Sequence, residues 1–172
     1  MHATIRPVRI DDCRAIAEIY NHYVQTSVIT FEEQAVSDEA MAQRIADVQS
    51  YNLPWVIYER NGVLLGYAYA TRWKPRSAYR YSVEITVYTA PGASGSGIGS
   101  ILYAELFARM KACGVHAAVG GIALPNAASI ALHEKFGMKK IGEFHEIGFK
   151  QGQWLNVGYW QIVFDQQDGA SV

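Results

Sequence analysis

The stretch that decides the fold of this chain runs Val87-Tyr88-Thr89-Ala90-Pro91-Gly92-Ala93-Ser94-Gly95-Ser96-Gly97-Ile98-Gly99-Ser100. It predicts a strand that enters a turn with four glycines, and the turn opens a helix. In such a turn several backbone N–H groups can point into one concavity, because no Cβ obstructs them. The helix dipole adds partial positive charge at the place where a phosphate would bind. The pattern indicates a phosphate-binding turn, although a glycine loop that only caps a helix has the same sequence.

Two other kinds of phosphate-binding loop do not fit this turn. A Walker loop needs Gly-Lys-Ser/Thr, whereas Gly99 is followed by Ser100 and Ile101. A Rossmann fingerprint lies in the first βαβ unit, with an acidic residue about 20 residues later at the end of the next strand. The turn here lies past the middle of the chain, and the next strand ends at Gly120-Gly121-Ile122 without an acidic residue. Both interpretations are therefore rejected.

The rest of the chain predicts strands and helices on both sides of the turn. Asn61-Gly62 is typical of a tight hairpin, Ser37 starts a helix, and Asp11 or Asp12 would cap an earlier one. Helices are expected from 11 or 12, from 37, over 99–113 and from 125 to about 136. Strands are expected over 4–8, 55–58, 63–70, 81–88 and 117–122, and twice within 140–164. The order predicts an α/β (α+β) domain with a mixed central sheet of about seven strands flanked by helices.

Composition limits the number of domains and the classes of partner. The 172 residues are enough for one domain, expected over residues 1–166 and followed by a disordered tail at 167–172. The formal net charge is −1, and no run of Lys and Arg occurs, so neither nucleic acid nor a membrane surface is an expected partner. The apolar stretches are the length of strands, and no signal peptide is evident, so we expect a cytoplasmic protein.

Beyond the turn, Asn126-x-x-Ser129 and His133-x-x-x-Gly137 follow at spacings that resemble the GNAT superfamily of N-acetyltransferases. The loop pattern of that family, Gln/Arg-x-x-Gly-x-Gly/Ala, falls on residues 94–99, with Ser94 in place of the leading Gln or Arg. More narrowly, the chain resembles the phosphinothricin / methionine sulfoximine acetyltransferase branch. The segments that carry this resemblance are Ile19-Tyr20-Asn21, Thr30-Phe31-Glu32, Trp73-Lys74-Pro75-Arg76, Ser82-Val83-Glu84, Leu124-Pro125-Asn126, His133-Glu134 and Gly148-Phe149-Lys150 through Trp154 to Trp160-Gln161.

The resemblance implies acetyl-CoA as the co-substrate. It places the pantetheine along the strand that carries Val87 and Thr89, with Asn126 and Ser129 beside it. It places the pyrophosphate on the N–H groups of residues 95–100. The cofactor-binding candidates are therefore Val87, Tyr88, Thr89, Gly95, Ser96, Gly97, Ile98, Gly99, Ser100, Asn126 and Ser129.

Glu84 and His133 are the catalytic candidates. Strand alternation puts Glu84 on one face with Ser82 and Thr86, which is compatible with either a solvent-facing side chain or a site residue. The resemblance implies that Glu84 is the general base for the amine. It places His133 near the sulfur, as the acid for the departing thiolate or as a second base, whereas a lone histidine is otherwise a surface residue. No metal site is expected, because no pair of histidines has ligand spacing with a third ligand.

Residues 73–81 contain three cations and three aromatic side chains just before the strand that carries Glu84. They could form a solvated loop or a clamp for an anionic substrate, because Arg and Lys bind carboxylates. With the resemblance, the substrate-binding candidates are Phe31, Lys74, Arg76, Tyr79, Arg80 and Thr86.

The function expected from this resemblance is acetyl transfer from acetyl-CoA to the α-amino group of a small amino-acid-like substrate. A glutamate analogue such as phosphinothricin would be attacked directly in a ternary complex, with Glu84 as general base. The alternatives are a methionine sulfoximine/sulfone acetyltransferase on the same scaffold and a non-catalytic acyl-CoA-binding module. The resemblance also implies a homodimer.

Overall fold

The computed structural model describes residues 3–164, so the tail predicted at 167–172 lies outside the described residues. The single domain over 1–166 also stays a prediction. In chain order the elements are β1 (Ala3–Pro7), η1 (Ile10–Asp12), α1 (Cys13–Thr26), α2 (Asp38–Ser50), β2 (Trp55–Arg60), β3 (Val63–Arg72), η2 (Ser77–Tyr79), β4 (Ser82–Thr89), α3 (Ile98–Ala112), β5 (Ala117–Ala123), α4 (Ala127–Lys135), β6 (Lys139–Lys150) and β7 (Gln153–Val163).

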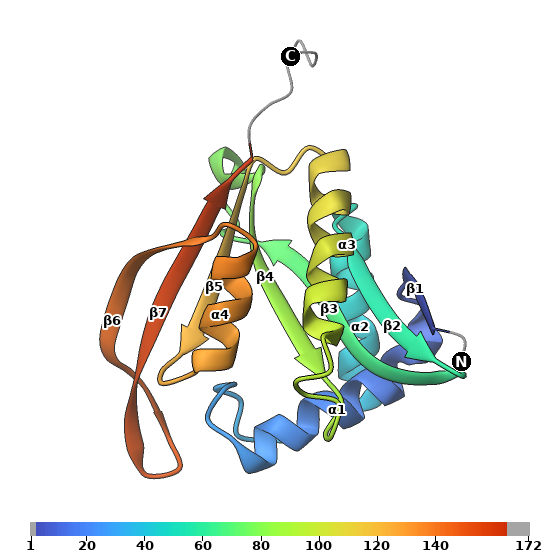
Figure 1. Cartoon of the computed structure of the whole chain (residues 1–172), viewed down its shortest axis with the longest axis horizontal. Helices are drawn as coiled ribbons and strands as arrows, with labels where there is room; N and C mark the ends of the chain where they lie inside the picture. The colour runs from blue at the N-terminus through green and yellow to red at the C-terminus, as the bar shows by residue number, and fades with distance from the viewer. Residues whose placement is uncertain (1–2, 165–172) are drawn as a thin grey trace.

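Within residues 3–164 the strands form one seven-stranded sheet in the order β1-β2-β3-β4-β5-β7-β6 (Figure 1). Neighbouring strands are antiparallel except β4 and β5, which pair in parallel. This arrangement confirms the predicted α+β class with a mixed sheet flanked by helices. None of the helices described is both long and apolar enough to cross a bilayer.

Several local predictions are confirmed because the chemistry that specifies them lies within a few residues. The Ser37 hydroxyl accepts a hydrogen bond from the Ala40 N–H at 3.2 Å and caps α2. Asn61 and Gly62 have φ angles of 51° and 79°, the left-handed values that a two-residue hairpin between β2 and β3 requires. Gly114, with φ of 81°, follows α3 as expected of a C′ residue.

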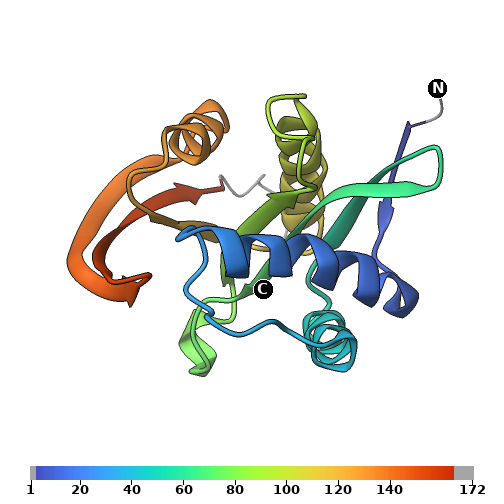
Figure 2. The same cartoon turned by 90° about the horizontal axis from the view of Figure 1, so that it is seen from below.

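Two layers of helices cover the sheet (Figure 2). On one face α3 buries Leu102, Leu106 and Met110 against inward side chains of the strands, such as Ala68 and Ile85. On the other face α1 and α2 form a second core, which consists of Val8, Ile16, Ala17, Ile19, Tyr20, Val24, Val36, Met41, Ile45, Val48, Trp55, Ile57 and Tyr67. The two faces of the central strands therefore lead to two separate environments.

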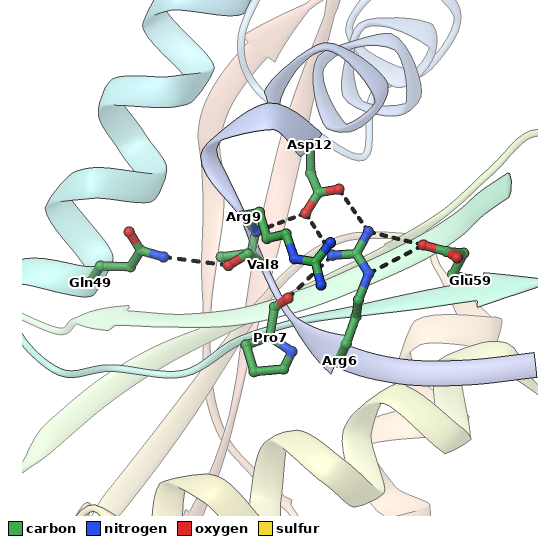
Figure 3. A network of polar contacts seen from close by, with 7 residues as sticks. All are labelled: Arg6, Pro7, Val8, Arg9, Asp12, Gln49 and Glu59. Atoms are coloured by element: carbon green, nitrogen blue, oxygen red, sulfur yellow. Dashed lines mark hydrogen bonds and ion pairs between the residues drawn. The ribbon is translucent and has the colours of Figure 1, made fainter. Parts of the chain in front are cut away.

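The prediction that the Asp12 side chain caps α1 is wrong, although Asp12 does occupy the position before the helix. Its side chain makes no cap hydrogen bond to the helix. Both carboxylate oxygens instead accept from Arg6 at 2.8 Å, and one also accepts from the Arg9 N–H at 2.7 Å (Figure 3). Arg6 donates to Glu59 on β2 as well, at 2.9 Å. An ion pair between β1, β2 and the start of α1 takes the place of the cap.

Burial raises the pKa of the Asp12 carboxyl, but hydrogen bonds from Arg6 and Arg9 outweigh burial and hold that pKa below its usual value. A lowered folded-state pKa adds stability that is complete above about pH 4 and is lost as the pH falls through the folded value. We expect Asp12→Asn to lower the free energy of unfolding by about 1–2 kcal/mol at pH 7, with the deficit shrinking at pH 3. Urea unfolding at both pH values checks this, with the exposed Asp11→Asn as control. An equal deficit at pH 7 and pH 3 contradicts the assignment.

Candidate active site

A gap opens in the middle of the sheet where β4 and β5 separate. The two strands pair only over three positions, from Ser82 with Ala117 to Glu84 with Val119. Beyond Glu84, β4 stays paired with β3 as far as Thr89, while β5 continues along β7. Figure 1 shows the two strands diverging below their paired upper ends. The edge of β4 that faces the gap is therefore left without a strand partner in the described residues.

A cavity of about 590 Å³ occupies this gap and the space between α3 and α4. Most of the predicted cofactor-binding residues line it, and Ser96 does not. Thr86 and His133 also line it, although they were predicted for other roles. The lining residues are Tyr23, Ile29, Ile85, Thr86, Val87, Tyr88, Thr89, Ala93, Ser94, Gly95, Gly97, Ile98, Gly99, Ser100, Tyr103, Gly121, Ile122, Ala123, Asn126, Ala128, Ser129, Ala131, Leu132, His133 and Lys135.

The glycine turn forms one end of the cavity at the start of α3. Gly95 and Gly97 have φ angles of 77° and 82°, a backbone conformation that residues with a Cβ rarely adopt. Gly97 is the residue before the helix, so the helix N-terminus faces the same space. Lys135 of α4, which also lines the cavity, donates to the Ser100 hydroxyl at 3.0 Å. The helix dipole and this ammonium together give the end of the cavity a positive potential suited to an anion.

Glu84 lies at the other end of the gap, on the last position where β4 and β5 pair. Its neighbours Val83 and Ile85 are buried in the core beneath α3, so the predicted alternation is confirmed and Glu84 points to the opposite face. The side chain is half-buried rather than solvent-facing. Burial raises the pKa of its carboxyl, and the charge of Lys74 opposes that rise. A Cβ on Gly121 would lie 3.2 Å from the Glu84 Oε1, so the carboxylate packs on a cavity-lining strand.

His133 is buried between α3, α4 and β5, with 3% of its surface exposed, so the interpretation of a surface histidine is wrong. Its Nδ1 lies 2.7 Å from the Ser129 carbonyl, which can only accept, so Nδ1 carries the hydrogen. Its Nε2 is then the acceptor for the Tyr103 hydroxyl at 3.0 Å. Burial lowers the pKa of the imidazole, although the Ser129 carbonyl opposes this. The site holds a neutral imidazole with both nitrogens occupied.

The predicted substrate residues divide into two groups. Thr86 lines the cavity, whereas Phe31, Lys74, Arg76, Tyr79 and Arg80 are exposed outside it. The Lys74 ammonium lies 4.6 Å from the centre of the Trp73 ring and close enough to Glu84 to affect its pKa. The Arg80 guanidinium instead lies 4.5 Å from the centre of the Tyr81 ring. The segment 73–81 lies on the same side of the sheet as α2, opposite α3 (Figure 2).

Strand and helix spacings predict Tyr103, Trp154, Tyr159 and Trp160 as core residues, although large aromatic side chains could also line a pocket, and two of the four belong to the site. Tyr103 is fully buried but lines the cavity and bonds His133. Tyr159 of β7 packs edge-on against Trp73, with ring centres 5.9 Å apart. Burial raises the pKa of the Tyr159 hydroxyl, and the charge of Glu84 raises it further. Trp160 is buried as expected, whereas Trp154 is exposed, so its assignment to the core is wrong. Lys135 was also missed, because no local pattern relates it to the turn 35 residues earlier.

Metal-ligating side chains do not gather in the described part of the chain. Across residues 3–164 no three His, Cys, Asp or Glu residues lie close enough together to hold a metal ion.

The comparisons with known proteins agree with this geometry. The family described as Acetyltransferase (GNAT) domain matches residues 5–157. Phosphinothricin N-acetyltransferase of Alcaligenes faecalis is 42% identical over 166 residues, which cover 96% of this chain and 84% of the relative. An L-methionine sulfoximine/L-methionine sulfone acetyltransferase of Salmonella typhimurium is 35% identical, with 95% of both chains covered.

A solved structure shows the same fold with a ligand bound. It is a GNAT superfamily phosphinothricin acetyltransferase from Sinorhizobium meliloti in complex with AcCoA. Its TM-score is 0.93 at 35% sequence identity, with 99% of this chain and 93% of that chain covered. The chain is therefore an acetyltransferase that belongs to the GNAT family.

Proposed function

We propose that this chain transfers the acetyl group of acetyl-CoA to the α-amino group of a small amino-acid-like substrate, of which phosphinothricin is the example. The observation that carries the proposal is the gap between β4 and β5. One cavity there runs from the glycine turn to the strand positions next to Glu84. A long, thin thioester could lie in such a cavity, and an amine could reach it from the opposite face of the sheet.

The residues of the cavity fit acetyl-CoA, which would supply the activated acetyl group as a thioester. The N–H groups of residues 95–100 and the Lys135 ammonium would bind the pyrophosphate. The unpaired edge of β4 at Val87 and Thr89 would pair with the pantetheine amides as another strand would. Asn126 and Ser129 line the same cavity, although the side-chain Oδ1 of Asn126 already accepts from the Ser129 N–H at 3.1 Å to cap α4. Ser96 is the weakest of the predicted contacts, since it lies outside the lining.

Glu84 would accept the proton that the substrate ammonium must lose before its nitrogen can attack. The amine needs this because an α-ammonium keeps its proton to about pH 8. A carboxylate with a raised pKa is a stronger base than an exposed one, which suits the role directly or through a water. The Val87 N–H, on the edge of β4 that faces the gap, would stabilise the oxyanion of the thioester carbonyl, whereas the Tyr88 N–H faces β3.

His133 and Tyr103 would act together near the thioester sulfur of acetyl-CoA. A neutral His133 whose Nδ1–H is bonded to Ser129 has no free hydrogen to give to a thiolate. The Tyr103 hydroxyl, which donates to His133 Nε2 at the cavity wall, keeps its own proton, because burial raises the pKa of this phenol far above its ordinary value. We therefore propose that this hydroxyl would turn from Nε2 to donate a hydrogen bond to the thiolate, which would then take its proton from solvent.

The substrate class rests on the relatives and on the exposed cations. Lys74, Arg76 and Arg80 would attract the α-carboxylate and the phosphinate or sulfoximine oxygens, while Phe31, Tyr79 and Thr86 would form walls. Polyamines are poor candidates, because the same cations would repel them. The exposed side chains of the β6–β7 hairpin, Ile141, Phe144, Ile147, Phe149 and Trp154, would form a homodimer interface. The expected cytoplasmic location stays a prediction.

Release of CoA thiol from acetyl-CoA on addition of the amine tests this function. We expect turnover with phosphinothricin and methionine sulfoximine, with a higher kcat/KM for phosphinothricin, and little with a polyamine. A higher kcat/KM for methionine sulfoximine would support the alternative acetyltransferase on the same scaffold. Acetyl-CoA binding without turnover of any amino-acid amine would contradict the enzyme and favour the acyl-CoA-binding module.

A further inference from the structure

Lys150, the last residue of β6, is buried in a way that is unusual for lysine. Only 3% of its surface is exposed, whereas lysine is almost never buried unless its ammonium is paired. Its Nζ donates a hydrogen bond of 2.8 Å to the carbonyl of Thr30, which is 120 residues away in sequence. Thr30 belongs to residues 27–37, which connect α1 to α2 and are called here the α1–α2 segment. The ammonium therefore joins the far edge of the sheet to that segment.

The α1–α2 segment also supplies the charge that compensates the buried ammonium. Burial lowers the pKa of Lys150, while the carboxylates of Glu33 and Glu32 act in the opposite direction. Glu32 is held in turn by Arg44 of α2 at 2.7 Å. An ammonium out of water needs such partners, because its desolvation is otherwise costly. The partners of Lys150 that are described here all lie on the segment that it holds.

Gly148 adds a second contact between β6 and the same segment. Residues 148 and 150 lie on one face of the strand, because side chains alternate along it. A Cβ built on Gly148 would collide with the ring of Phe31, so the absence of a side chain there leaves the space that the ring occupies. Thr30 and Phe31 are thus bound by two alternate positions of β6, which we call the β6 seat (Gly148 and Lys150).

The other side of the α1–α2 segment faces the gap between β4 and β5. Ile29 lines the cavity, and the Thr30 hydroxyl shares a hydrogen bond of 2.7 Å with the Tyr20 hydroxyl. The Tyr20 ring packs edge-on against Tyr88 of β4, with ring centres 5.3 Å apart. Figure 1 shows this segment (light blue) extending from α1 below the open ends of β4 and β5 towards β6 and β7. Thr30 and Phe31 do not themselves line the cavity, so a shift of Thr30 would act beside the cavity, on the side of the sheet that carries α1 and α2.

We propose that Lys150 and Gly148 are positioning residues that fix Thr30 and Phe31 as one wall of the site for the amine substrate. This inference rests on the proposed function, because the wall is assigned to the amine that accepts the acetyl group and not to acetyl-CoA. It predicts a selective kinetic effect, because the seat acts on the segment and not on the glycine turn or on Glu84.

The first test is Lys150→Met, which keeps the apolar stem and removes the ammonium. We expect KM for phosphinothricin to rise about tenfold, with kcat and KM for acetyl-CoA changed less than threefold. The matched control is Lys139→Met, an exposed lysine on the same strand, which should leave all three parameters unchanged. A fall in kcat alone, or equal rises in both KM values, would overturn the proposal in favour of a general structural role.

The second test is a double-mutant cycle between Gly148 and Phe31. Gly148→Ala should raise KM for the amine in the wild-type background, because the new methyl group displaces the Phe31 ring. In a Phe31→Ala background the same change should have less than a twofold effect, since there is no ring to displace. Additive effects of the two substitutions would show that Gly148 does not act through Phe31.

A third measurement separates this proposal from the proposed function. Amide hydrogen exchange of residues 27–33 reports how firmly the segment is held, whether or not any amine is acetylated. We expect Lys150→Met to speed exchange there at least tenfold and Lys139→Met to leave it unchanged. Unchanged exchange in Lys150→Met would overturn the seat even in an active enzyme. Fast exchange in a wild-type protein that acetylates none of the amines would contradict both proposals.

Discussion

Glu84→Gln is expected to lower kcat/KM for the amine by about 10²–10⁴-fold, the usual effect of losing a general base. Glutamine keeps the size of the side chain and its contact with Gly121 but cannot accept the proton. The acid limb of the kcat/KM profile of the wild type should lie above the ordinary carboxyl pKa of about 4.3, because burial raises the pKa of Glu84. Thiol release measured from pH 5 to pH 9 checks both statements. Turnover near that of the wild type at all pH values would contradict the role of Glu84.

The same variant should not be less stable than the wild type at pH 7. A raised folded-state pKa means that ionised Glu84 is disfavoured in the fold, so its stabilising contribution exists only at low pH and is lost as the pH rises. We therefore expect the Tm of Glu84→Gln to equal or exceed that of the wild type at pH 7, with the difference shrinking towards pH 4. A Tm several degrees lower at pH 7 would mean that the loss of activity reports unfolding.

Gly120→Ala is expected to lower kcat/KM by about 10²-fold, because it displaces the buried histidine. A Cβ at Gly120 would collide with the His133 ring at Nε2, the atom that accepts from Tyr103. The ring cannot yield freely, since the Ser129 carbonyl holds Nδ1. Overpacking of this kind should also cost about 1–3 kcal/mol of unfolding free energy.

Gly142→Ala is the matched control for this substitution. Gly142 is also a strand glycine, but a Cβ there would meet no atom within 4 Å. We expect activity and stability of Gly142→Ala close to those of the wild type. Steady-state kinetics and urea unfolding of the two variants provide the comparison. Full activity of Gly120→Ala would contradict the proposed role of His133 and Tyr103 at the thioester sulfur.

The fold was largely predictable because its signals are local. The glycine turn, the Ser37 cap and the Asn61-Gly62 hairpin each depend on a few adjacent residues, and all three are confirmed. The Asp12 cap failed because Arg6 on β1 binds the same carboxylate, a contact that the helix-start pattern does not include. The divergence of β4 and β5 was not predicted, since strand patterns do not show where pairing ends.

The site was less predictable, because its contacts join residues far apart in the chain. Tyr103 and Lys150 look like a core aromatic residue and a surface cation until His133 and Thr30 are brought beside them. One signal could have located part of it. Adjacent glycines in a strand often mark the close approach of another group. Gly120 and Gly121 do so here, since they make room for His133 and Glu84.

A crystal structure with acetyl-CoA and phosphinothricin bound tests the central claim most directly. We expect the diphosphate on the N–H groups of residues 95–100 and the pantetheine along the free edge of β4. We also expect the thioester in the gap, with the substrate nitrogen hydrogen-bonded to Glu84 directly or through one water molecule. A coenzyme bound elsewhere, or a substrate amine on the far side of the molecule from Glu84, would contradict the account.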